Sequence, residues 1–400
     1  MELLEKSPLE RESSCPISNI CGGCSYQTLP YDAELMIKRK QIQDLFDGAG
    51  FSHIGINILA SPRPNRYRNK MEYSFGDAWK GGPLQLGLHR PGHYYEIVPT
   101  PDCNIVPGDY NCIRTYVEDF CRDGGFSYFH KQTKEGYLRH LVVRSSHSRK
   151  QIMVNLVTTS QAGFCEEDWS AFISGLLALE LEGSLISIYH TTNDSLADAV
   201  IPEKIDLLWG SDSFRETLNG LDFEVGPFSF FQPNVYTAEK IYDTAIEYAG
   251  FLVGKTVYDL YCGTGTITQL LAKRSTHVFG VEINAEAVEK AWQSAKNNGL
   301  DNISFVANDV LDELDKLKES GQSPDVLVID PPRGGIHPKA LEKMIEAAPE
   351  RIVYVSCNPR TMVEDLKVLS AGGYRLEKAR AVDQFPRTRH VEALVLMTRE

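Results

Sequence analysis

The chain of 400 residues has no apolar run long enough to cross a bilayer, and its first six residues lack the apolar core of a signal peptide. We therefore expect a cytoplasmic protein with no membrane partner. Positive charge is also scarce, because 41 Lys and Arg oppose 54 Asp and Glu, for a net charge of −13. This balance argues against broad, nonspecific attraction to nucleic acid. Residues 61–150 are the exception, since 14 Lys and Arg stand there against 9 Asp and Glu.

A disulfide framework is not expected in that compartment, although the chain has nine cysteines. Three of them form a C-x5-C-x2-C group, Cys15, Cys21 and Cys24, and two glycines before Cys24 let the backbone wrap closely around a bound group. Cys103 can supply a fourth thiolate. Four thiolates suit an iron–sulfur cluster or a structural zinc ion. The single distant cysteine favours the cluster, and zinc remains the alternative.

The hydrophobic pattern divides the chain into several segments. Residues 1–14 predict a flexible lead-in, and residues 27–58 predict a helical segment that packs on the last domain, with Lys38, Arg39 and Lys40 on one side of a helix at 31–46. Residues 15–26 and 59–225 predict one α+β domain, because short alternating runs separated by Gly, Pro and Asn are typical of an antiparallel sheet. Its expected strands are 67–75, 84–88, 138–144, 152–157 and 185–191. We predict a domain boundary, or joint, at Gly226, where the last domain (residues 226–400) begins.

The last domain alternates strand and helix patterns, which predicts an α/β fold with five parallel strands and a final hairpin at 374–382 and 392–398. After the strand at 256–261, a Gly263-x-Gly265 turn opens a helix, and Glu282 ends the next strand, 19 positions after Gly263. The complete G-x-G-x-x-G dinucleotide pattern is absent. An acidic residue at this distance can hold both ribose hydroxyls. The pattern therefore favours adenosylmethionine, whose nucleoside has the diol but no pyrophosphate, and the alternative is a tight turn without a ligand.

Two further strands of this domain end in reactive side chains. The run 324–329 ends at Asp330 and the run 353–356 ends at Cys357, and a proline follows closely in each case, which turns the backbone away from helix. Parallel neighbours would place both side chains on one rim, where open α/β sheets bind ligands. The alternative for Cys357 is an inert cysteine in a core strand.

Five motifs follow one another along the chain. They are Phe230-Phe231-Gln232-Pro233-Asn234, Asp259-Leu260-Tyr261-Cys262-Gly263-Thr264-Gly265, Asp330-Pro331-Pro332-Arg333, Ser356-Cys357-Asn358-Pro359 and Phe385-Pro386-Arg387-Thr388-Arg389-His390-Val391-Glu392. Together they resemble the RNA uracil-C5 methyltransferases of the RumA and TrmA type, from Cys15 to the C-terminus. The cysteine group is similar to that of the 23S ribosomal RNA branch, whose members carry a 4Fe–4S cluster.

The resemblance implies a C-terminal Rossmann-like class I domain that depends on S-adenosylmethionine (SAM), and an α+β central domain that holds the iron–sulfur cluster and binds RNA. Many ribosomal members begin with an RNA-binding β-barrel, the TRAM domain, for which we expect no room in this chain. That departure leaves the choice of RNA target open.

The resemblance also assigns roles to residues. Cys357 would add to C6 of uracil and make C5 a nucleophile for the methyl group, and Glu392 would then remove the C5 proton. Without the resemblance, a surface carboxylate paired with Arg389 and His390 is the favoured explanation of Glu392. The implied cofactor-binding residues are Gln232, Tyr261, Gly263, Gly265, Thr266, Glu282, Asp309 and Asp330. The implied metal ligands are Cys15, Cys21, Cys24 and Cys103, and the RNA-contact candidates are Phe230, Arg66, Arg68 and Arg139.

The expected substrate is a single-stranded or flipped uridine in RNA, with 23S ribosomal RNA favoured over transfer RNA, and the expected assembly is a monomer. Two other functions remain open. An amino-group nucleic-acid methyltransferase would stack a purine on an aromatic residue after Asp-Pro-Pro, where this chain has Arg333, and it would need no nucleophilic cysteine. An iron–sulfur electron carrier or RNA-binding scaffold would not turn over SAM. Covalent trapping on 5-fluorouridine RNA separates the expected reaction from amino-group methylation.

Overall fold

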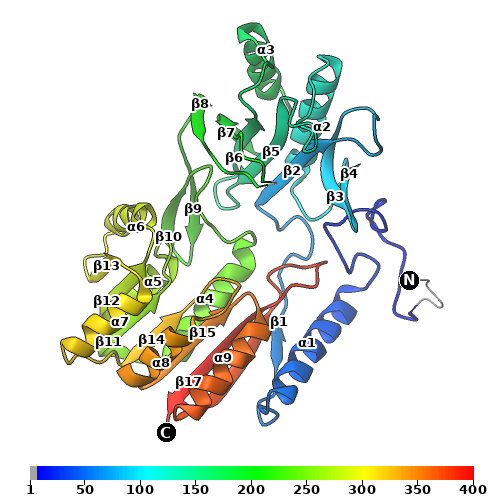
Figure 1. Cartoon of the computed structure of the whole chain (residues 1–400). Coiled ribbons are helices and arrows are strands. Elements are labelled where there is room, and N and C mark those ends of the chain that lie inside the picture. Colours follow the sequence, from blue (N-terminus) through cyan, green and yellow to red (C-terminus); the bar gives the residue numbers. More distant parts are fainter. Residues whose placement is uncertain (1–6, 198) are drawn as a thin grey trace.

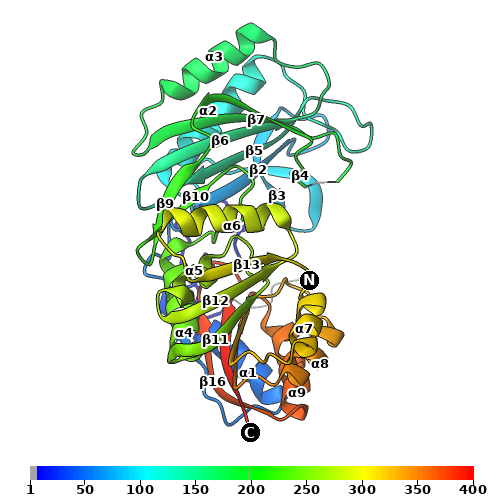
Figure 2. The same ribbon diagram turned by 90° about the vertical axis from the view of Figure 1, so that its left-hand side faces the viewer.

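The computed structural model describes residues 7–197 and 199–400, without the side chain of Tyr94, and arranges them as two large sheets with helices on their faces and one two-stranded sheet (Figure 1). Residues 1–6, part of the predicted lead-in, lie outside the described residues. The two sheets occupy the two ends of an elongated molecule (Figure 2). None of the described helices is long and apolar enough to span a membrane.

The eight-stranded C-terminal sheet has the strand order β1-β16-β17-β15-β14-β11-β12-β13. Its strands are β1 (Asn57–Leu59), β11 (Leu252–Leu260), β12 (Ser275–Glu282), β13 (Ile303–Ala307), β14 (Val326–Ile329), β15 (Arg351–Ser356), β16 (Tyr374–Val382) and β17 (Glu392–Arg399). Its helices are α1 (Tyr31–Gly48), α4 (Val235–Ala249), α5 (Thr266–Ala272), α6 (Ala285–Asn297), α7 (Val310–Glu319), α8 (Pro338–Ala347) and α9 (Pro359–Ala371). The strands β11 to β15 are parallel. The predicted final hairpin is present, but β17 lies between β15 and β16, because the long loop 383–391 lets it turn back into the sheet.

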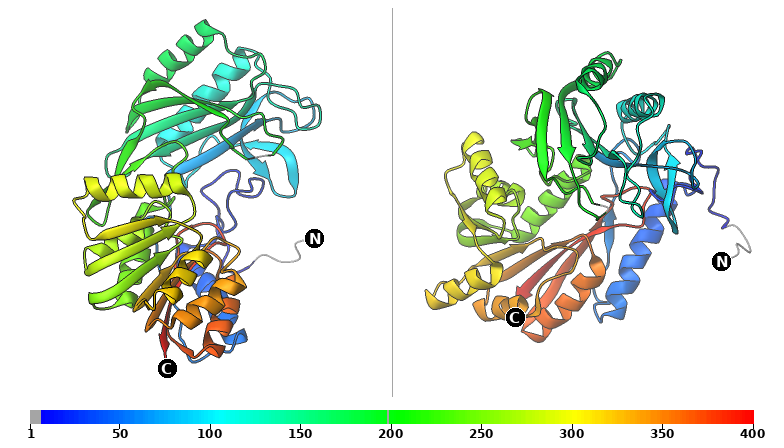
Figure 3. Two further views of the ribbon diagram at one scale, coloured as in Figure 1. Left: turned by 60° about the vertical axis from the view of Figure 1, so that its left-hand side comes forward. Right: turned by 45° about the horizontal axis from the view of Figure 1, so that its top comes forward.

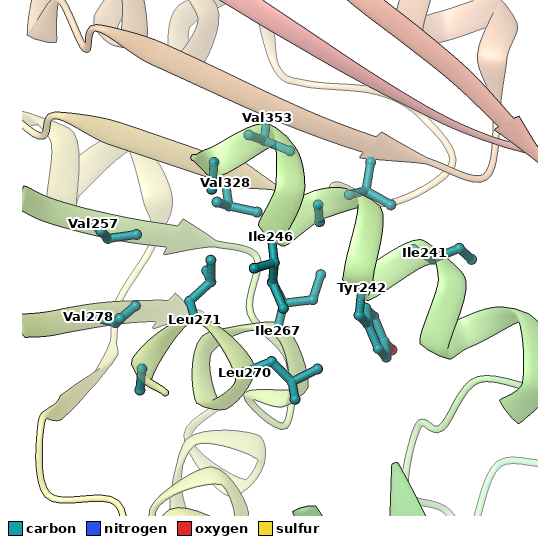
Figure 4. Close-up of a cluster of buried hydrophobic side chains, with 14 of the residues drawn as sticks. Ile241, Tyr242, Ile246, Val257, Ile267, Leu270, Leu271, Val278, Val328 and Val353 are labelled. Carbon is teal, nitrogen blue, oxygen red and sulfur yellow. The ribbon is translucent and has the colours of Figure 1, made fainter. Parts of the chain in front are cut away.

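Helices cover both faces of this sheet, so β14 and the inner part of β15 are buried on both sides, as expected for parallel strands. Val353 of β15 packs in a core with α4, α5 and α6 (Figure 4). Its neighbour Ile352 points the other way, into a core with α8 and α9. Ile42 and Phe46 of α1 belong to this second core, so the N-terminal helix lies along the C-terminal domain (Figure 3).

The seven-stranded central sheet has the order β4-β3-β2-β5-β6-β7-β8. Its strands are β2 (Lys70–Gly76), β3 (Gln85–Arg90), β4 (His93–Pro99), β5 (Leu138–Ser145), β6 (Gln151–Thr158), β7 (Ser184–Thr192) and β8 (Lys204–Gly210), with the helices α2 (Gly108–Asp123) and α3 (Glu166–Leu177). All neighbours are antiparallel except β6 and β7. The prediction of an antiparallel sheet was wrong at that pair, because α3 forms the crossover that a parallel connection requires.

The hairpin of β9 (Phe214–Leu218) and β10 (Leu221–Val225) links the two sheets. Its base packs on the central sheet, where Phe214 and Val225 share a small core with Met153. Its tip packs on the C-terminal domain, because Leu221 and Phe223 belong to the core around α4. The joint predicted at Gly226 therefore lies at the end of a hairpin that contacts both domains.

Candidate active site

Four polar side chains meet at the carboxyl edge of the C-terminal sheet. Asp330 follows β14 and Cys357 follows β15, and these strands are parallel neighbours. Tyr261 follows β11 on the other side of β14. Glu392 opens β17, whose next residue pairs with the last residue of β15, so Glu392 begins beside Cys357. All four side chains line one cavity.

This cavity has a volume of about 940 Å³, and both domains contribute to its wall. Other predicted site residues in the wall are Cys24, Arg68, Phe230, Gln232, Gly263 and Thr266. Wall residues that were not among the predicted site residues include Gly22, Gly23, Ser25, Tyr242, Asp259, Arg333, Phe385, Thr388, Arg389 and His390. The presence of the cysteine segment 22–25 is unexpected, because it lies far from the motifs of the C-terminal domain in sequence.

Three predicted cofactor residues lie outside this wall. Glu282 ends β12 and accepts hydrogen bonds from the backbone of Gly263 (3.1 Å) and Asn284 (2.9 Å). Asp309 caps α7 by accepting a hydrogen bond from the Leu311 N–H at 2.7 Å. Gly265 has a positive φ of 75°, and a β-carbon there would lie 2.6 Å from the Phe305 ring, so the turn requires glycine. These residues shape the turn and the strand edge beside the cavity.

Asp259 is a fully buried carboxylate in the cavity wall and was not among the predicted site residues. One of its oxygens accepts a hydrogen bond from the Thr268 hydroxyl at 2.5 Å, and the other has no partner among the described residues. Burial raises the pKa of Asp259 to about 7. A buried carboxylate oxygen without a donor favours a cationic ligand.

Two more acidic side chains, Asp330 and Glu392, line the same space. Burial raises the pKa of Asp330 to about 7. Burial, and then the neighbouring Asp330, raise the pKa of Glu392 to about 8, while Arg333 opposes this shift. Because Glu392 is only 4% exposed, the surface ion-pair explanation of this residue is wrong. The cavity therefore concentrates acidic groups whose ionised forms a positively charged ligand would stabilise.

Cys357 is half-buried at the centre of this rim. Burial, and then Glu392 and Asp330, raise the pKa of its thiol to about 11, and Arg333 lowers it. The Arg333 guanidinium lies 3.4 Å from the Nδ1 of His390, and its carbonyl accepts a hydrogen bond from the Asn358 side chain at 2.9 Å. The thiol therefore needs an added positive charge, or fewer negative ones, to become a nucleophile at neutral pH.

The loop 383–391, which leads into Glu392, is fixed along most of its length. On one side, the side chains of Gln384 and Gln232 are hydrogen-bonded at 3.0 Å. The Tyr67 hydroxyl donates a hydrogen bond to the Pro386 carbonyl at 2.9 Å. Arg387 has a positive φ of 69°, an unfavourable conformation for a residue with a β-carbon that needs surrounding contacts to hold it.

The four predicted metal ligands are free cysteines that lie within electrostatic reach of one another. Burial raises the pKa of Cys24 to about 12, and the charges of Cys103, Cys21 and Cys15 add to this shift. The Gly23 N–H donates a hydrogen bond to the sulfur of Cys21 and the Gln27 side chain donates one to the sulfur of Cys24, as suits bound thiolates. Among the described residues, no three His, Cys, Asp or Glu are placed to hold a single metal ion.

The RNA-contact candidates fall into different environments. Phe230 is 70% exposed at the mouth of the cavity, and Arg68 lies in its wall. Arg66 lines a separate, smaller cavity. Arg139 is 4% exposed and donates hydrogen bonds to the carbonyls of residues 193, 195 and 197 at 2.6–2.7 Å. The burial of Arg139 contradicts its prediction as an RNA contact.

Comparison with known proteins gives a consistent result. The family model "tRNA (Uracil-5-)-methyltransferase" matches residues 212–400. An uncharacterized RNA methyltransferase of Clostridium tetani is 44% identical over 403 residues, covering all of this chain and 87% of that protein. One of Caldanaerobacter subterraneus subsp. tengcongensis is 42% identical and has similar coverage.

A solved structure extends the likeness to three dimensions. The tRNA (uracil-54, C5)-methyltransferase of Pyrococcus abyssi, in complex with S-adenosyl-L-homocysteine, is 27% identical, with a TM-score of 0.76 over 99% of this chain and 88% of that chain. The α/β fold of the C-terminal domain thus matches that of class I SAM-dependent methyltransferases. The chain belongs to the RNA uracil-5 methyltransferase family and is an RNA methyltransferase of the uracil-5 type.

Proposed function

We propose that the protein methylates C5 of a uridine in 23S ribosomal RNA through a covalent bond between Cys357 and C6. The observation that carries the proposal is the meeting of Cys357, Asp330 and Glu392 on one wall of a cavity of about 940 Å³. A surface cleft of this size accepts a base that has left its stack, at an unstacking cost of a few kcal/mol.

SAM fits the acidic part of this cavity and supplies an electrophilic methyl group when it is bound. The unpartnered oxygen of Asp259 and the carboxylate of Asp330 favour a cationic ligand, and Gln232, Tyr261, Gly263 and Thr266 complete the wall beside them. A positive charge at this place lowers the pKa values of the surrounding acids and of the Cys357 thiol. Binding of the donor would therefore help to prepare the nucleophile.

The protein side chains then act in sequence. The Cys357 thiolate adds to C6, which moves the electron pair of the C5–C6 double bond toward C5 and the O4 carbonyl. C5 would take the methyl group from the donor, whose sulfur would keep the electron pair of the broken bond, and the Glu392 carboxylate would accept the proton that C5 must lose. The electrons of the broken C5–H bond restore the double bond and expel the sulfur of Cys357 as thiolate.

The RNA would lie against the mouth of the cavity, where Phe230 offers an exposed ring for stacking and Arg68 a positive charge. Arg66 would contact the RNA backbone further along the central domain. Cys15, Cys21, Cys24 and Cys103 would hold a 4Fe–4S cluster that orders this surface.

The test uses RNA that carries 5-fluorouridine. A fluorine at C5 cannot leave as a cation, so the Cys357 adduct should persist through denaturing electrophoresis. Cys357→Ala should form no adduct and lose methyl transfer by at least about 10⁴-fold. Cys112→Ala, which removes an exposed cysteine of α2, is the matched control and should behave as wild type. An active Cys357→Ala protein would contradict the proposal.

Transfer RNA is the second candidate substrate, because the similar Pyrococcus abyssi protein is a tRNA (uracil-54, C5)-methyltransferase. Mapping 5-methyluridine in both RNA classes from cells with and without this protein distinguishes the two. Loss of the modification from transfer RNA alone would replace the ribosomal assignment and leave the chemistry unchanged.

A further inference from the structure

The loop 383–391 is attached to the N-terminal part of the chain through a buried lysine. Lys38 of α1 is 0% exposed. Its Nζ lies 2.8 Å from Glu34 and 2.6 Å from Asp383, and it donates a hydrogen bond to the Phe385 carbonyl at 3.2 Å. Asp383 and Phe385 are both in the loop, so one ammonium group joins α1 to the segment that precedes Glu392.

The charged side chains around Lys38 pair with one another. Tyr31 donates a hydrogen bond to Asp383 at 2.8 Å. Glu34 accepts a second hydrogen bond, from the Arg387 N–H at 2.7 Å, and lies 3.6 Å from the Arg387 guanidinium. Two basic and two acidic side chains thus balance in a buried place. Removal of one partner from such a set leaves an uncompensated charge, so the group favours one geometry.

The cysteine segment holds the same loop from another direction. The backbone N–H groups of Ser25 and Tyr26 both donate to the Arg387 carbonyl, at 2.8 and 2.9 Å. The Gly22 N–H donates to the His89 carbonyl of β3 at 3.1 Å, and a β-carbon on Gly22 would lie 2.6 Å from that oxygen. The segment is therefore fixed between the central sheet and the loop.

We propose that Ser25, Tyr26, Glu34 and Lys38 form an N-terminal clamp that positions Glu392, with Lys38 as its central positioning residue. The inference rests on the proposed function, because it takes Glu392 as the base that removes the C5 proton. Cys357 lies outside the clamped loop, between β15 and α9. Loosening the clamp should therefore spare addition of the thiolate and methyl transfer, and should slow the proton removal that releases the product.

The experiment measures each step separately with an ordinary uridine substrate. In Lys38→Met, steady-state turnover should fall by about 100-fold, the scale expected when a catalytic group is displaced by about 1 Å. Methyl transfer in a single turnover should stay within about threefold of wild type. A covalent protein–RNA complex that already carries the methyl group should accumulate, detected by denaturing electrophoresis with labelled donor.

Two further variants keep the test decisive. Glu34→Gln retains an oxygen that can accept from Lys38 and Arg387, so it preserves the shape of the clamp while removing one charge. It should show the same accumulation to a smaller extent, and it decides the question alone if Lys38→Met does not fold. Lys40→Met is the matched control, because Lys40 lies on the same helix in an exposed pair with Asp44.

The outcomes are distinct. Accumulation of the methylated adduct in the clamp variants, but not in Lys40→Met, supports the clamp. Turnover equal to that of Lys40→Met overturns it, and so does a loss of turnover in which single-turnover methyl transfer falls equally. Failure of the wild-type protein to form an adduct with 5-fluorouridine RNA overturns the proposed function itself, whatever the clamp variants do.

Discussion

The two sheets of the molecule use polar residues in opposite ways. In the C-terminal sheet, Asp330, Cys357 and Glu392 stand at strand ends and face a cavity. In the central sheet, Arg139 and Arg144 stand inside β5 and are buried. Arg139 donates hydrogen bonds to three carbonyls of the segment 193–197, and Arg144 donates to two carbonyls at residues 226 and 227.

The position along the strand accounts for the difference. A side chain within a covered strand must find its partners in the protein, because a buried charge without partners is costly. Arg144 is 3% exposed, and this burial lowers its pKa to about 10. The end of a strand borders open space and has few neighbouring groups to pair with. Reactive side chains there can therefore remain available to a ligand. The arginines of β5 therefore stabilise the fold, whereas the residues at the C-terminal rim are available for chemistry.

The largest effect that distinguishes the two sheets should come from Glu392→Gln. An amide cannot accept the C5 proton, so turnover should fall by about 10³-fold, within the usual range for loss of a general base. The methylated adduct with Cys357 should accumulate on ordinary uridine RNA, which denaturing electrophoresis would detect. Full turnover by this variant would show that Glu392 takes no part in the reaction. It would also weaken the contrast between reactive residues at the ends of the C-terminal strands and structural arginines inside β5.

The next effect concerns the central sheet. Arg139→Met removes charged donors from three backbone carbonyls and should reduce the free energy of unfolding by about 3 kcal/mol, as measured by urea denaturation. RNA affinity of the folded variant should remain within about twofold of wild type at a fixed salt concentration. A selective loss of RNA affinity, with stability unchanged, would restore Arg139 as an RNA contact.

A smaller effect links the acidity of the rim to stability. The pKa of Glu392 is about 8 in the folded protein, against an ordinary value of 4.5. Between these values the folded protein keeps a proton that the unfolded chain releases, so the contribution of Glu392 to stability falls as pH rises. Glu392→Gln lacks this proton, and its stability relative to wild type should grow by a few kcal/mol between about pH 5 and about pH 8. A constant difference over that window would show that Glu392 is not held uncharged.

Much of the C-terminal domain could be predicted from the sequence, because short local patterns of residues specify its strands and turns. Each parallel strand is a short apolar run that ends in a turn, so the tips at Asp330 and Cys357 could be located from spacing alone. The pairing of β1 with β16 and the insertion of β17 next to β15 were missed. These pairings join segments that are distant in sequence, and no local pattern specifies their order.

In the N-terminal part, side-chain contacts with distant segments could not be predicted from the sequence either. Lys38 was predicted to lie with Arg39 and Lys40 on one side of the helix at 31–46, but in the structure it is buried between Glu34 and the loop 383–391. Its other partner, Asp383, lies 345 positions away. The cysteine group could be recognised from its spacing, but its place in the cavity wall depends on contacts with β3 and the loop 383–391. Asp259 was quoted within a motif, yet its unpartnered oxygen depends on packing.

The smallest effect should come from Arg68, which belongs to the central domain but faces the cavity. Its Nε donates a hydrogen bond to the Lys70 carbonyl at 2.8 Å, which leaves other donors of the guanidinium for RNA. If Arg68 neutralises one phosphate of a single strand, Arg68→Met should reduce the slope of log K against log salt by about 0.7 and weaken binding by about tenfold or less. The control Arg122→Met alters an exposed arginine of α2 that pairs with Asp119, and it should leave the slope unchanged. A slope that Arg68→Met does not alter would place Arg68 with Arg139 and Arg144, among the arginines that serve only the fold.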